Sequence, residues 1–359
     1  MRLRVFHLDP CAARRPAVIA VFALLSVSGC TRTGAAGARS AAFYDQTYLS
    51  ASHNWVFRGE FPRVDALFNA FDYGHAKLYE TLWRDPTAAR PVLDERQFQF
   101  ITHHLLRHPP SVPLDEGAIA PEWEKLAPEV AEMFDWAHML HRQIYDIWSD
   151  DRIHPADKDG RVASLLAYYK SRRELAFSSK PKNMNLMEGQ SYSLSFRKRF
   201  PTYNGLIWSY HWLQMTLYEA LLASNSPQER KQNVDAVVAR FWVLLDSAPT
   251  SLPTAMPQSP EIAPAFSSRY PEAAIIFDNL HSLHDVVSDI LADPAVPRGD
   301  KRRFILQAAA SYRDDTTSVV TIEGWKAMAH AMDLTRMGGR APLCVARASE
   351  NAHDCEKQP

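Results

Sequence analysis

The chain has 359 residues, of which 46% are hydrophobic, and its 40 lysines and arginines stand against 41 aspartates and glutamates. This length and apolar content suffice for one large or two ordinary globular domains, which excludes a disordered chain. A formal net charge of −1 provides no broad basic field, so a nucleic-acid-binding role is not expected.

The first 29 residues have the organisation of an export signal. An arginine-bearing start precedes an apolar run from Ala17 to Val27, which is too short to span a membrane comfortably, and small residues then lead to Cys30. We therefore expect residues 1–29 to be a signal peptide.

The sequence VSGC, which ends at Cys30, resembles the lipobox of bacterial lipoproteins. This resemblance implies that Cys30 is acylated and that residues 30–57 form an anchored linker. Since Thr31 rather than aspartate follows the cysteine, the resemblance further implies an outer-membrane lipoprotein that faces the periplasm.

An internal repeat follows the linker. FPRVDALFNAFDYGHAKLYETL begins at Phe61, and FPTYNGLIWSYHWLQMTLYEAL begins at Phe200, an offset of 139 residues. FDWAHMLHRQIYDI from Phe134 and FDNLHSLHDVVSDI from Phe277 share the pattern FDxxHxLHxxxxDI at an offset of 143. Repeats at a fixed spacing indicate a duplicated structural unit.

Both copies read as helices, because apolar residues recur at spacings of three and four and no sustained alternation of period two is present. The sequence predicts an all-α helical bundle with two tandem related units. Their expected ranges are 58–180 and 197–320, followed by a C-terminal helix and polar tail at 321–359. Further helices are expected at 95–107, 161–175, 228–245 and 301–313.

Six of the fourteen histidines fall in the repeated segments, whereas the others follow no repeated pattern. On a helix each residue advances about 100°, so the aspartate and two histidines of DxxHxxH project from one side. Imidazole nitrogens and carboxylate oxygens suit Zn, Fe, Mn or Cu, and helical bundles commonly build metal sites from such spacings. The candidate metal ligands are Asp135, His138, His141, Asp278, His281, His284, Asp72, His75 and His211.

Four acidic residues near these motifs are weaker candidates. Glu80 and Glu219 match across the repeat, but they lie about 80° around their helices from Asp72 and His211, which favours a supporting or surface role. Asp146 and Asp289 end the shared pattern. They are weaker ligand candidates.

The arrangement is similar to that of ferritin-like di-iron four-helix bundles, which carry carboxylate and histidine ligands at i, i+3 on two helices. The similarity lies in the arrangement and not in the sequence: this chain has DxxHxxH where those proteins have ExxH. It implies a metal site between helices and a metal-dependent oxidoreductase or metal-handling protein.

Other interpretations of the histidine pattern remain open. The aspartates and histidines can form a solvated helix face or a purely structural hydrogen-bond network, which would make the chain a non-catalytic scaffold for envelope partners. Paired histidines on facing helices can also hold haem b. Cys344 and Cys355 form a disulfide or stay as two free thiols, and because they are the only two cysteines beyond Cys30 in the sequence, a zinc ribbon is not expected.

Overall fold

The computed structural model describes residues 47–87, 89–246, 259–332, 334 and 337–343, and all of these belong to one compact unit, residues 36–359. The described residues are helical and contain no strand, apart from an isolated bridge between Lys182 and Val319. The predicted all-α fold is confirmed. Cys30, Cys344 and Cys355 lie outside the described residues, so their predicted roles stay predictions.

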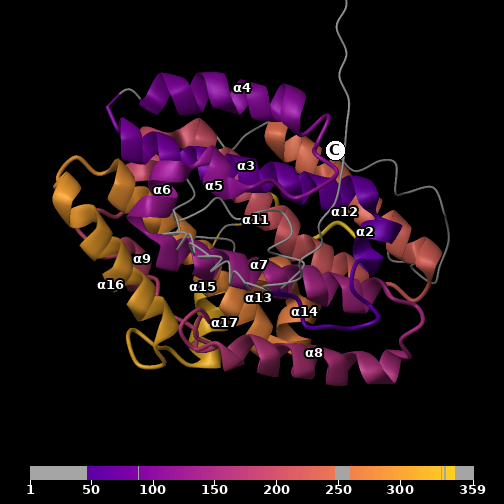
Figure 1. Ribbon diagram of the computed structural model, residues 1–359. Coiled ribbons are helices and arrows are strands. Elements are labelled where there is room, and N and C mark those ends of the chain that lie inside the picture. Colours follow the sequence, from indigo (N-terminus) through magenta and orange to yellow (C-terminus); the bar gives the residue numbers. More distant parts are fainter. Residues whose placement is uncertain (1–46, 88, 247–258, 333, 335–336, 344–359) are drawn as a thin grey trace, which may run out of the picture. The chain divides into compact units, whose positions relative to one another are not determined.

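Figure 1 shows the helices of the first half of the chain, from α2 to α8. They are α2 Val56–Glu60, α3 Pro62–Arg84, η1 Pro91–Gln97, α4 Phe98–Phe100, η2 Ile101–Leu105, α5 Glu116–Ile119, α6 Pro121–Leu126, α7 Pro128–Ser149 and α8 Pro155–Ser171. The region expected at 95–107 is thus helical, but η1 and η2 have the wider turn of a π-helix.

The helices of the second half of the chain follow α8. It contains α9 Asn185–Glu188, α10 Ser195–Arg199, α11 Pro201–Leu222, α12 Pro227–Asp246, α13 Ser259–Ile262, α14 Pro264–Arg269, α15 Pro271–Ala292, η3 Arg298–Asp300, α16 Lys301–Arg313 and α17 Ile322–His330. The helix predicted at 301–313 has those bounds in the structure. No helix in the described part of the chain combines the length and apolarity needed to cross a membrane.

Proline defines where the long helices begin. α3, α7, α11 and α15 each start at a proline, as do α6, α8, α12 and α14. Proline is favoured at the first helical position because its fixed φ suits the helix and its missing N–H would have no intrahelical partner there. These four long helices contact one another and carry most of the core.

A buried carboxylate holds the start of the short helix α2. Asp146 on α7 accepts the backbone N–H of Trp55 at 3.0 Å and that of Phe57 at 2.8 Å. Trp55 is the residue before α2 and has a φ of 71°, a left-handed conformation that residues other than glycine rarely adopt. The two hydrogen bonds therefore fix a backbone turn that is unfavourable by itself.

The same device recurs in the second half. Asp289 on α15 accepts the N–H of Leu194 at 2.9 Å and that of Phe196 at 2.8 Å, and Leu194 has a φ of 67°. Arg197 adds an ion pair of 2.8 Å in which both side chains are fully buried. Asp146 and Asp289 were weak candidates as metal ligands. In the structure they fix the backbone turn at the start of α2 and of α10.

Two further contacts recur at the repeat spacing. Glu80 accepts the backbone N–H groups of Glu122 and Trp123 at the start of α6, and Glu219 accepts the two equivalent groups at the start of α14. A carboxylate at a helix N-terminus satisfies unpaired donors and complements the helix dipole. The supporting role expected for both glutamates agrees with these contacts.

A lysine ammonium caps the C-terminal end of α7, and another caps the C-terminal end of the equivalent helix α15. Lys158 donates to the carbonyl of Trp148 at 2.9 Å in the last turn of α7. Lys301 donates to the carbonyls of Ile290 and Leu291 in the last turn of α15, and burial lowers the pKa of Lys301 to about 8. Recurrence of contacts at offsets of 139 and 143 is what a duplication predicts, although the division into two units itself stays a prediction.

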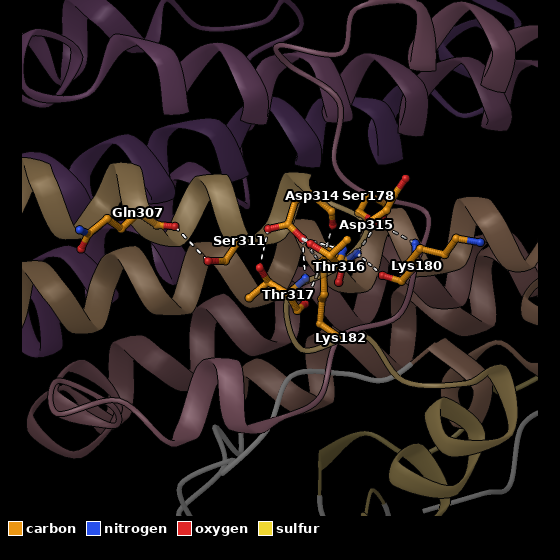
Figure 2. A network of polar contacts seen from close by, with 10 residues as sticks. Ser178, Lys180, Lys182, Gln307, Ser311, Asp314, Asp315, Thr316 and Thr317 are labelled. Atoms are coloured by element: carbon orange, nitrogen blue, oxygen red, sulfur yellow. Dashed lines mark hydrogen bonds and ion pairs between the residues drawn. The ribbon is translucent and has the colours of Figure 1, made fainter.

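The segment that contains Ser178 and Lys182 is hydrogen-bonded to the loop after α16. Lys182 donates from Nζ to the carbonyl oxygens of Asp314 at 2.6 Å and Thr317 at 2.9 Å, and the Ser178 hydroxyl donates to Asp315 at 2.5 Å (Figure 2). The Asp314 carboxylate also accepts the N–H and hydroxyl of Thr317. These bonds attach a long connection to the helical core.

We predict that Asp289→Asn lowers the free energy of unfolding by about 3 kcal/mol, because it removes the carboxylate that forms a buried ion pair of 2.8 Å with Arg197. Urea denaturation of the metal-free protein measures this. Asp235→Asn is the matched control: its pair with Lys231 is exposed, so it should cost about 0.5 kcal/mol or less. Equal losses for the two variants would contradict the role assigned to Asp289.

Candidate metal centre

The structure brings all six histidines of the repeated segments into one group of neighbouring rings, which we call the histidine cluster. His75 comes from α3, His138 and His141 come from α7, His211 comes from α11, and His281 and His284 come from α15. Every ring in the cluster lies within 6.5 Å, between ring centres, of at least two others of the six. Each of the four long helices α3, α7, α11 and α15 therefore contributes at least one imidazole to the cluster.

Three of these residues, His75, His211 and His284, offer nitrogens that lie within 4.8 Å of one another, and we call them the histidine trio. Nε2 of His211 lies 3.2 Å from Nε2 of His75 and 3.2 Å from Nδ1 of His284. In a tetrahedral site with metal–nitrogen bonds of about 2.1 Å, neighbouring ligand nitrogens lie about 3.4 Å apart. The trio is a buried group of a geometry that can hold a metal ion.

Hydrogen bonds between three neutral rings cannot account for both of the 3.2 Å contacts to Nε2 of His211. Nδ1 of His75 lies 3.1 Å from the carbonyl oxygen of Phe71, which can only accept, so Nδ1 carries the proton and Nε2 presents a lone pair. A proton on Nε2 of His211 would then have to serve His75 and His284 together. A cation that accepts all three lone pairs removes this conflict, and its cost is one unpaired N–H at Nδ1 of His211, which has no hydrogen-bond partner.

Protonation of the rings does not resolve the conflict either. The exposed fraction of the three side chains is 4% or less. Burial lowers the pKa of His75 to about 4, and burial together with neighbouring imidazoles lowers the pKa values of His211 and His284 well below the usual value. At neutral pH the trio is therefore uncharged, the form in which imidazole ligates a metal.

The other three histidines surround the trio. His281 stacks on His211 with 4.2 Å between ring centres, and its Nε2 lies 3.2 Å from Oε1 of Gln214. His141 contacts the Tyr218 hydroxyl through Nδ1 at 2.6 Å. His138 is partly buried, but both its ring nitrogens are shielded from solvent and have no hydrogen-bond partner.

One of the predicted aspartates, Asp72, lies beside Arg142. Asp72 lies 3.5 Å from the Arg142 guanidinium, and burial raises the pKa of Asp72 to about 7 against the opposing effect of that charge. Asp135 is partly exposed, and its charge contributes to the rise at Asp72. Neither joins the three nitrogens that come together in the trio.

Asp278 has different partners. It accepts hydrogen bonds from the backbone N–H and hydroxyl of Ser259 and from the indole N–H of Trp325 at 2.8 Å, and burial raises the pKa of Asp278 to about 7. The carboxylate therefore joins α13 and α17 to α15. Asp278 is not one of the three residues of the trio, and its predicted role as a metal ligand stays a prediction.

Sequence reasoning identified Gln214, which matches His75 across the repeat, as able to ligate or to hydrogen-bond, but it missed the other groups that orient the imidazoles. Tyr218, Gln214 and the carbonyl of Phe71 hold individual ring nitrogens, and Phe277 stacks on His141 with 3.5 Å between ring centres. Gln214 and Tyr218 lie within the repeated segment that begins at Phe200, but their histidine partners lie on other helices, so the segment alone does not assign them this role. The position of Gln214, three residues after His211, is the one available signal.

Comparison with protein-family models, with curated proteins and with solved structures finds no match for this chain in any of the three.

We predict that the stability difference between the metal-free wild type and His75→Gln changes with pH. Because the folded pKa of His75 is about 4, below the unfolded value of about 6.5, only the unfolded wild-type chain takes up this proton as pH falls. The wild type should therefore lose about 2 kcal/mol relative to the variant between about pH 7 and 5. Urea denaturation across this range measures the difference. His108→Gln, which makes the same substitution at an exposed histidine, is the control. A stability difference between wild type and His75→Gln that does not change with pH would contradict the lowered pKa of His75.

Proposed function

We propose that this chain is a metal-binding protein of the bacterial cell envelope whose centre is the histidine trio. The observation that carries the proposal is the approach of two imidazole nitrogens to one nitrogen of His211, both at 3.2 Å, in a buried place. Neutral rings without a cation leave at least one of these contacts without its own proton. The function we infer is metal-dependent, either redox chemistry or the storage and handling of a transition metal.

The donor set narrows the choice of ion. A site of three imidazoles suits Zn, Cu or Fe, whereas Mn prefers carboxylate and water oxygens. The chain's own residues hold the rings in place: the Phe71 carbonyl fixes the proton on His75, and stacking of His281 fixes the plane of His211. Orientation of ligands by such neighbours typically changes metal affinity by about 10- to 100-fold.

Haem b is less well supported than a bare ion. Two histidines that ligate haem stand on opposite faces of the porphyrin, so the macrocycle must fit between their nitrogens. The 3.2 Å between the nitrogens of His75 and His211 leaves no space for it. A non-catalytic scaffold is the remaining alternative, and it predicts a protein without bound metal.

We further propose that Cys30 carries a lipid that anchors the protein to the outer membrane, on the strength of the VSGC sequence after an apolar run. The anchored protein would face the periplasm. Its protein or redox partners are not indicated by any residue.

We predict that the purified protein without its signal peptide contains a transition metal after expression in metal-replete medium, and that His211→Gln reduces the content to background. The reason is that His211 supplies the nitrogen common to both short contacts. Elemental analysis of size-exclusion fractions measures the metal. Background content in the wild type would leave the scaffold as the better interpretation.

His53→Gln is the matched control for this measurement. His53 is also a buried histidine, and both of its ring nitrogens lack hydrogen-bond partners, but it lies outside the histidine cluster. Its replacement should leave the metal content unchanged. A loss of metal in both variants would point to a general effect on folding.

We predict that Cys30→Ser abolishes incorporation of a fatty-acid label and moves the full-length protein out of the membrane fraction, since the serine hydroxyl replaces the thiol that would be lipidated. Expression in a bacterium that processes lipoproteins, followed by fractionation, tests this. A label that persists in the variant would contradict the anchor.

A further inference from the structure

The fourth long helix, α7, places a histidine beside the trio without contributing to it. α3, α11 and α15 each supply one ring of the trio, and α7 supplies His138, whose ring centre lies 5.6 Å from that of His284 and 6.5 Å from that of His75. In the described part of the chain, both ring nitrogens of His138 are shielded from solvent and have no hydrogen-bond partner. A neutral imidazole carries one N–H and one lone pair, so either tautomer leaves a donor without an acceptor.

An imidazole N–H without an acceptor is unfavourable in a protein interior. Most buried polar side-chain atoms have a partner, because an N–H that loses its hydration gains nothing in return unless an acceptor replaces the water. Desolvation of the ring lowers the pKa of His138 to about 3, so the ring stays neutral at physiological pH and presents one N–H. A ligand with an acceptor atom next to His138 would remove this cost.

The rings around the trio are packed less tightly on the side of α7. His281 covers His211 with 4.2 Å between ring centres, and Phe134 covers His284 with 4.1 Å. The 5.6 Å between His138 and His284 is wider than either of these distances. The wider spacing favours the α7 side as the place where a further small group approaches the trio.

Part of His138 is accessible to solvent. The residue is partly exposed although its two ring nitrogens are shielded, so the exposed area belongs to its other atoms. Asp135, one turn earlier on α7, is partly exposed as well, whereas the residues of the trio are at most 4% exposed. His138 therefore connects the buried trio to the solvent-exposed part of α7.

The charge of a bound ion selects the kind of ligand. The three rings of the trio are neutral, so a divalent ion bound to them keeps both positive charges. The buried aspartates of the predicted ligand set already have partners. Asp72 lies beside Arg142, which also pairs with Asp65, and Asp278 accepts a hydrogen bond from Ser259. Because an uncompensated charge is unfavourable in the interior, an anion from solution would stabilise the ion more than a neutral ligand does.

We propose that the ion of the trio takes a small monovalent anion as its fourth ligand, and that His138 donates a hydrogen bond to this anion. This inference rests on the proposed metal centre and deepens it by naming the class of molecule that the centre binds. Metal sites with three protein ligands commonly keep the fourth tetrahedral position for water or substrate. The rings of the cluster stand close together, so the anion is limited to a few atoms, such as hydroxide or azide.

The test uses the protein without its signal peptide, loaded with Co²⁺ in chloride-free buffer and titrated with sodium azide. The visible absorption of Co²⁺ changes when its fourth ligand is exchanged, and we expect one azide to bind per ion in the wild type. His138→Phe keeps an aromatic ring but has no donor. Its Co²⁺ content should be unchanged, and its dissociation constant for azide should rise about 10- to 100-fold, as expected for the loss of a hydrogen bond to a charged group.

Two further variants are matched to this measurement. The glutamine amide keeps an N–H donor at position 138, so His138→Gln should bind azide more tightly than His138→Phe does. His53 is a buried histidine outside the cluster whose ring nitrogens also lack partners, and His53→Gln should leave the azide affinity unchanged. A loss of affinity in His53→Gln as large as that in His138→Phe would overturn the assignment of the hydrogen bond to His138.

The outcomes separate this inference from the metal centre on which it rests. No binding of Co²⁺ or Zn²⁺ by the wild type would overturn the metal centre itself. Bound Co²⁺ whose spectrum azide leaves unchanged would overturn the anion site and leave the centre in place. Equal azide affinities in wild type and His138→Phe would overturn the role of His138. Loss of Co²⁺ from His138→Phe would overturn that role as well, since His138 would then hold the ion itself.

Discussion

The core of this protein depends on one nitrogen atom, Nε2 of His211, which two other imidazole nitrogens approach to 3.2 Å. The three rings come from α3, α11 and α15, so the contact joins helices that are distant in the sequence. Without a cation it concentrates lone pairs in a medium of low polarity, where they repel. A cation bound to the three nitrogens would join α3, α11 and α15 directly.

The rest of the helical framework can be understood as support for this place. Asp146 and Asp289 fix the entries of α2 and α10, and Glu80 and Glu219 fix the starts of α6 and α14. These carboxylates accept hydrogen bonds from backbone N–H groups at helix ends. The bonds fix the positions of the long helices relative to the short ones. Rigid placement matters because a metal site tolerates only small errors in ligand position.

Local patterns explain how much of this could be predicted. The spacing of DxxHxxH and its repetition identified all six histidines of the cluster, because helical periodicity fixes which side chains share a side. The same spacing included Asp278, whose partners Ser259 and Trp325 come from elements that no local pattern relates to it. The contacts that hold a ring nitrogen of His141 and of His281 likewise come from other helices, and only the folded chain shows them.

The repeat also shows how two equivalent positions have diverged. At matching places in the repeated segments, α3 carries Asp72 and His75 where α11 carries His211 and Gln214. His75 and His211 meet in the trio, while Asp72 pairs with Arg142 and Gln214 holds His281. The imidazoles that converge on one point thus come from non-equivalent positions of the two copies. The trio is therefore asymmetric with respect to the repeat, because Asp72, the residue that matches His211, lies beside Arg142 instead.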